Sequence, residues 1–105
     1  MPLQDVAAQF GALAASIRQC KPDAAVIALL DALHGLCEQT AARVTGEART
    51  LLSNLTTALR TWQDVWPRLG TQPEFRGAVV REAELWSKRL AAMAKETART
   101  TRADS

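Results

Sequence analysis

The chain has 105 residues, of which 48% are apolar and 23% are charged, with only five glycines and four prolines. This composition is that of a globular domain and excludes a disordered chain, while the length allows a single domain with a thin core. The formal net charge of +2 is too small to indicate nucleic-acid binding by itself.

A first helix is predicted over residues 3–20, because the apolar residues there recur at steps of three and four. Pro2 suits the first turn of a helix, and Asp5 is favoured near its positive end. The apolar seam consists of Leu3, Val6, Phe10, Leu13, Ile17 and Cys20. The segment 21–23 contains Pro22 and ends this helix, and so short a connection predicts that the next helix returns antiparallel to the first.

Residues 23–66 contain no proline, and their apolar residues stay in helical register throughout. We therefore predict one long central helix of roughly 65 Å at 1.5 Å per residue. Thr45 and Gly46 form its weak point, because glycine costs about 1 kcal/mol in a helix relative to alanine. A break at Thr45-Gly46 would give a four-helix up-and-down bundle instead. No capping residue follows Gly46, so we favour the continuous helix.

A turn with two prolines and Gly70 precedes a third predicted helix over residues 73–98. Its apolar face consists of Phe75, Val79, Ala83, Trp86, Leu90 and Met93. Residues 99–105 are expected to form a disordered polar tail. The predicted fold is all-α: one domain over residues 1–98, an antiparallel helical bundle of three helices in which the central one is long.

The predicted helix lengths favour self-association. The first and third helices together match the central one, so a layer two helices thick would leave apolar faces uncovered. A symmetric homodimer would cover such faces, and another protein is a further possible partner. The candidate protein interface consists of Leu29, Leu36, Leu52, Leu59, Trp62, Trp66 and Trp86. The tryptophans could alternatively form an aromatic plug that closes one end of the core.

Basic residues recur along the third predicted helix and form a candidate basic face: Arg81, Lys88, Arg89, Lys95, Arg99 and Arg102. Such a face could follow a phosphate backbone or an acidic partner. Glu84 lies four residues before Lys88, the order that favours pairing within a helix, so we expect a solvated and partly self-paired face. A nucleic-acid-associated regulatory protein is the alternative function.

The sequence contains no pattern of catalytic, cofactor-binding or metal-ligating residues. His34 is its only histidine, and Cys20 and Cys37 occupy apolar helix positions where small buried side chains are expected. No apolar run reaches the ~18 residues needed to span a membrane, and no signal peptide is recognised. We predict a cytoplasmic, non-enzymatic protein without cofactor, metal or small-molecule substrate, which acts through helix–helix association.

Overall fold

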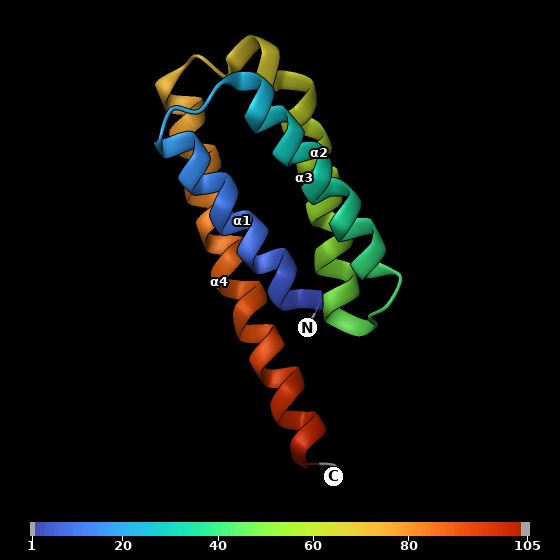
Figure 1. Ribbon diagram of the computed structural model, residues 1–105. Coiled ribbons are helices and arrows are strands. Elements are labelled where there is room, and N and C mark those ends of the chain that lie inside the picture. Colours follow the sequence, from blue (N-terminus) through green and yellow to red (C-terminus); the bar gives the residue numbers. More distant parts are fainter. Residues whose placement is uncertain (1, 104–105) are drawn as a thin grey trace.

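Four helices make up the computed structural model, which describes the backbone of residues 2–103 and the burial of residues 3–96. They are α1 (Pro2–Arg18), α2 (Asp23–Ala41), α3 (Gly46–Leu69) and α4 (Pro73–Ala103) (Figure 1). The predicted all-α class is confirmed, and the described residues contain no strand.

The prediction of one continuous central helix is wrong, because the chain leaves the helix after Ala41 and begins another at Gly46. Gly46 has a φ of +69°, in the left-handed region that glycine enters without the steric cost of a Cβ atom. Thr45 is extended and occupies the N-cap position of α3, although its side chain makes no capping hydrogen bond. The break therefore depends on the backbone freedom of one glycine, and it produces the four-helix alternative.

The first helix ends at Arg18, two residues before its predicted end. The N–H of Cys20 donates to the carbonyl of Ile17, and the N–H of Lys21 donates to that of Ser16, both at 3.1 Å. Cys20 itself has a φ of +55°. These bonds form a Schellman motif in which a cysteine stands where glycine is usual. Cys20 is consequently exposed, which contradicts the prediction that it is buried.

The last two helices also extend further than predicted. Helix α3 continues past Trp66 to Leu69 with Pro67 in its final turns, and the N–H of Gly70 donates to the Trp66 carbonyl at 2.8 Å. Helix α4 continues to Ala103, so the expected polar tail is helical over 99–103. Residues 104–105 lie outside the described part of the chain.

The helices pack as two antiparallel pairs, α1 with α4 and α2 with α3, and α1 also contacts α2 (Figure 1). Helices α3 and α4 make little contact with each other, and α4 extends beyond the rest of the bundle. Apolar side chains from all four helices form one core, with fully buried members that include Phe10, Leu30, Leu33, Leu52, Leu55, Val79 and Leu90. One side of α4 is thus covered by α1, while the side toward α3 is only loosely covered.

Small residues allow α1 and α4 to lie close together. Ala7 and Ala14 of α1 and Ala83 of α4 are buried. The Ser87 hydroxyl donates to the Ala7 carbonyl at 2.7 Å, and Arg18 pairs with Glu84 across the same two helices. Helix α4 is therefore anchored to α1 along one side, which determines which of its residues remain accessible.

Candidate interaction surface

Three residues of the predicted interface lie in the core of the chain itself. Leu52 and Leu59 are fully buried, and Trp66 is 1% exposed, so none of them is available to a partner. The break before Gly46 is the reason, because it folds α3 back onto α2 and covers leucines that a continuous helix would have exposed. The remaining members, Leu29, Leu36, Trp62 and Trp86, are half-buried against the core.

Trp66 is the centre of a junction at the end of the bundle where the 70–72 turn lies. Its ring centroid is 5.8 Å from that of Phe75, and its indole N–H donates to a carboxylate oxygen of Asp23 at 3.3 Å. The guanidinium of Arg76 lies 5.5 Å from the Trp66 ring centroid. An aromatic plug at this end is therefore present, but its partners are Phe75 and Arg76 rather than the other tryptophans.

Arg76 ties this junction to the ends of two helices. It donates to the carbonyl of Ile17 at 3.2 Å and to that of Gly70 at 2.7 Å, and its guanidinium lies 3.9 Å from the Asp23 carboxylate. Carbonyls at helix C-termini lack partners within the helix, and a guanidinium satisfies them while favouring the negative end of the helix dipole. The residues come from positions 17, 23, 66, 70 and 76, so no local sequence pattern could have revealed the group.

Trp86 occupies a separate place, in an open groove of about 480 Å³ between α3 and α4. Its lining residues are Glu47, Thr50, Leu51, Asn54, Trp86, Arg89 and Met93. The guanidinium of Arg89 lies 5.7 Å from the Trp86 ring centroid, which is a cation–π contact. The groove exists because α3 and α4 are hardly in contact, and it leaves an aromatic ring accessible beside a charged side chain.

Leu85 precedes Trp86 on α4 and is 56% exposed, whereas the other exposed large hydrophobic residue, Ile27, is 36% exposed. These two are the only large hydrophobic side chains that the described residues leave exposed. A single exposed leucine is ordinary, but this one adjoins a half-buried tryptophan on the open side of α4. The periodicity that predicted the helix could not identify Leu85, because its exposure depends on where α1 and α3 lie.

The predicted basic face is exposed wherever its side chains are described, at Arg81, Lys88, Arg89 and Lys95. The side chains of Arg99 and Arg102 lie outside the described residues. Glu84 pairs with Arg18 of α1 instead of with Lys88. Within the described part of the chain, Lys88 consequently has no ion-pair partner, and the expected self-pairing of this face is reduced.

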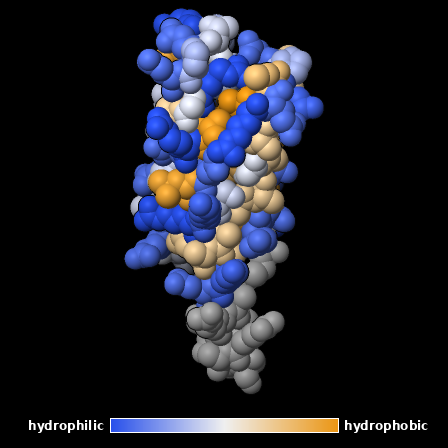
Figure 2. Space-filling view, turned by 90° about the vertical axis from the view of Figure 1, so that its left-hand side faces the viewer, coloured by the Kyte–Doolittle hydropathy of each residue, from blue (hydrophilic) through white to orange (hydrophobic). Residues whose placement is uncertain are grey.

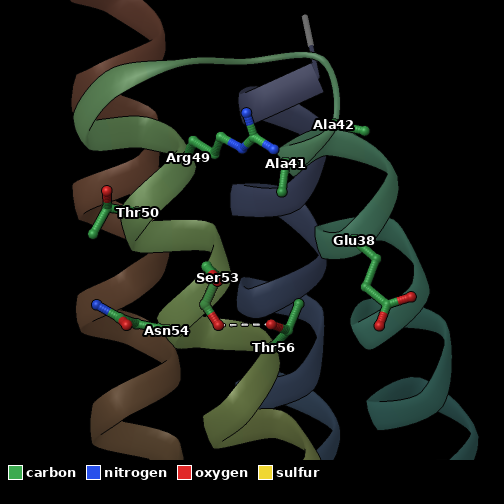
Figure 3. A pocket seen from close by; sticks show the side chains of 8 residues that line it. All are labelled: Glu38, Ala41, Ala42, Arg49, Thr50, Ser53, Asn54 and Thr56. Carbon is green, nitrogen blue, oxygen red and sulfur yellow. Dashed lines mark hydrogen bonds between the residues drawn. The ribbon is translucent and has the colours of Figure 1, made fainter.

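A polar hollow of about 540 Å³ lies where α2 ends and α3 begins (Figure 3). Glu38 from α2 and Arg49 from α3 are its charged residues, and the others are two alanines, three hydroxyl-bearing residues and Asn54. The Thr56 hydroxyl donates to the Ser53 carbonyl at 2.6 Å, and the Thr50 hydroxyl donates to the carbonyl of Gly46 at 3.3 Å. These hydroxyls are engaged by their own helix, and the hollow offers no activated nucleophile.

A third hollow, of about 760 Å³, lies where the end of α1 meets the start of α4. Ile17, Cys20 and Val80 supply apolar surface there, and three arginines, including Arg76, border it. Figure 2 shows this side of the molecule, with hydrophobic surface lying between the two helices among hydrophilic atoms. Arg76 already bonds two carbonyls, so this hollow is the outer side of the Trp66 junction.

The remaining titratable groups do not assemble into a reaction centre in the described residues. Neither cysteine forms a disulfide, and burial raises the pKa of the Cys37 thiol to about 12. His34 faces Glu38 at 3.6 Å, one helical turn away. No group of three histidine, cysteine or acidic side chains within the described chain could hold a metal ion. None of the described helices combines the length and apolarity needed to cross a membrane.

Comparison with protein-family models, with curated proteins and with solved structures finds no match to this chain.

Proposed function

We propose that this chain is a non-enzymatic helical module that acts through helix–helix association, as a homodimer, and that α4 supplies the associating surface. The supporting observation is the open side of α4. This helix has 31 residues, packs along α1 and leaves the side next to α3 loosely covered, with Leu85 exposed and Trp86 in a groove.

Burial of apolar surface provides the driving force for such association. Removing it from water contributes about 25 cal/mol per Å², and tryptophan and arginine are the residues that most often anchor protein interfaces. Helix α4 carries an exposed apolar side chain, a tryptophan and an arginine within two turns, at Leu85, Trp86 and Arg89. The chain breaks before Gly46 and each monomer has its own core, so the lengths of the helices do not require a dimer and the proposal depends on the open side of α4.

Sedimentation equilibrium of the full chain at micromolar concentration tests this proposal. We expect a mass of twice the 11.4 kDa of the monomer, falling toward the monomer on dilution. A chain that sediments at the monomer mass throughout would refute the homodimer.

A second function is supported by the pairing of Glu84 with Arg18, which leaves Lys88 without an ion-pair partner in the described structure. Exposed Arg81, Lys88 and Lys95 could then contact phosphates, in which case affinity for a DNA or RNA strand would fall steeply with salt. Fluorescence anisotropy with a labelled duplex and a labelled single strand is the test, and Lys88→Gln should weaken binding more than Arg60→Gln on α3. The absence of binding at low salt would dispose of this function.

A further inference from the structure

Between residues 78 and 93, one side of α4 carries six residues whose positions form a single stripe: Ala78, Glu82, Leu85, Trp86, Arg89 and Met93. Steps of three and four residues, and their sums, place side chains on the same side of a helix. All six are exposed or half-buried in the single chain. This stripe includes the exposed leucine, and its last members line the groove between α3 and α4.

The stripe is symmetric about the midpoint between Leu85 and Trp86. Glu82 and Arg89 are equally far from that point, and so are Ala78 and Met93. In an antiparallel pair of identical helices, a two-fold axis at this midpoint places each residue opposite the other member of its own pair. The same contacts therefore form twice.

The three resulting contacts are chemically complementary. Leu85 meets the ring of Trp86 of the second copy, which buries the most exposed large hydrophobic side chain described. Glu82 meets Arg89 of the second copy, so that opposite charges pair on both sides of the axis. Small Ala78 meets the long, flexible side chain of Met93 of the second copy, and a small residue opposite a large one permits close packing.

We propose that a second copy of this chain docks on the stripe, with α4 antiparallel to α4 and the two-fold axis between Leu85 and Trp86. This inference rests on the proposed function and specifies its surface and register. The charges identify the occupant as a second copy, because one helix carries both the acid and the base that the pairing requires. Charge pairs of this kind determine register and partner choice more than overall affinity.

The surrounding structure prepares this surface for docking. The Arg89 guanidinium is already held 5.7 Å from the Trp86 ring centroid, which restricts its orientation before association. The open groove beside the stripe, with Leu51 on its α3 wall, gives apolar side chains of a second copy space to pack. Pairing of α1 with α4 on the other side, through Arg18 and Glu84, holds the helix in place.

Charge reversal of the full chain tests the register. Glu82→Arg places arginine opposite arginine twice, and Arg89→Glu places glutamate opposite glutamate twice. Each variant alone should raise the dimer dissociation constant by at least about tenfold, because like charges opposite one another cost several kcal/mol. An equimolar mixture of the two should form heterodimers with near wild-type affinity, since both charge contacts are then restored. Arg60→Glu, an exposed reversal on α3, is the matched control and should dimerise normally.

The outcomes separate this inference from the proposed function. A monomeric wild type overturns both. A dimeric wild type whose Glu82→Arg and Arg89→Glu variants dimerise equally well overturns the register and leaves self-association standing. Weakened single variants that are not restored by mixing also overturn the register. Leu85→Ala provides a second variant, which should weaken the dimer while the circular dichroism of the diluted monomer stays unchanged, and an unaltered dimer would count against the stripe.

Discussion

Replacement of Gly70 by alanine tests the packing of the Trp66 junction. Gly70 has helical backbone angles, so alanine fits its conformation, but the added Cβ would lie 2.6 Å from the Trp66 carbonyl oxygen and 2.8 Å from two atoms of its ring. Trp66 is 1% exposed and is held by Phe75, Arg76 and Asp23, so it cannot move aside alone. Overpacking of this kind costs about 1–3 kcal/mol.

A loss of that size should lower the melting temperature by about 4–8 °C for each kcal/mol in a chain of this length. Circular dichroism at 222 nm, with heating and with urea at one fixed protein concentration, measures it. Gly77→Ala is the control, because nothing lies within 4 Å of its added Cβ and alanine is the better helix former, so its stability should rise by up to about 1 kcal/mol. A Gly70→Ala protein as stable as the wild type would refute the description of the junction.

Three further predictions concern other parts of the chain. Gly46→Ala should destabilise the fold by about 1–2 kcal/mol, because a positive φ is unfavourable for alanine, whereas Gly35→Ala inside α2 should not destabilise it. Equal urea midpoints for the two variants would contradict this prediction. Arg76→Lys should cost about 1–3 kcal/mol in thermal unfolding, since an ammonium cannot hold both carbonyls and lie over the ring, and Arg81→Lys should be neutral. Burial raises the Cys37 pKa from 9.0 to about 12, so its stabilising contribution is complete below pH 9 and is lost as pH rises toward 12. Above pH 9, the free energy of unfolding measured with urea should therefore fall more steeply in the wild type than in Cys37→Ala, by up to about 1.4 kcal/mol per pH unit. Parallel pH profiles of the two proteins would refute this prediction.

Apolar periodicity predicted the helical class and most of the helix starts, because the spacing of side chains on a helix is a local property. The starts at residues 23 and 73 agree with the structure, and both follow or contain a proline. The sequence indicates Thr45-Gly46 as the weak point, but the lack of a capping residue after Gly46 does not make the helix continuous. The N-cap position is Thr45, before it, and the break depends on a backbone angle that residue identity permits without requiring.

The candidate surface was only partly predictable. Leu52 and Leu59 belong to the predicted interface because a continuous helix would expose them, and their burial follows from the break. Trp86 belongs to the predicted interface and is half-buried, whereas Leu85 is absent from the prediction and is exposed, because the exposure of both depends on the positions of neighbouring helices. The contacts of Arg76 join residues far apart in the sequence, and helical spacing carries no information about them.

The antiparallel pairing of α4 with itself is tested most directly by an intermolecular distance. A spin label on Lys95→Cys, in a Cys20→Ser background that leaves only buried Cys37, reports on a described and exposed position of α4. With the axis between Leu85 and Trp86, Lys95 lies opposite Arg76 of the second copy, so the two labels are separated by about 19 residues of helix, or about 30 Å. Pulsed electron resonance at micromolar concentration should give that distance. The absence of intermolecular coupling, or a much shorter distance such as parallel helices would produce, would contradict the pairing.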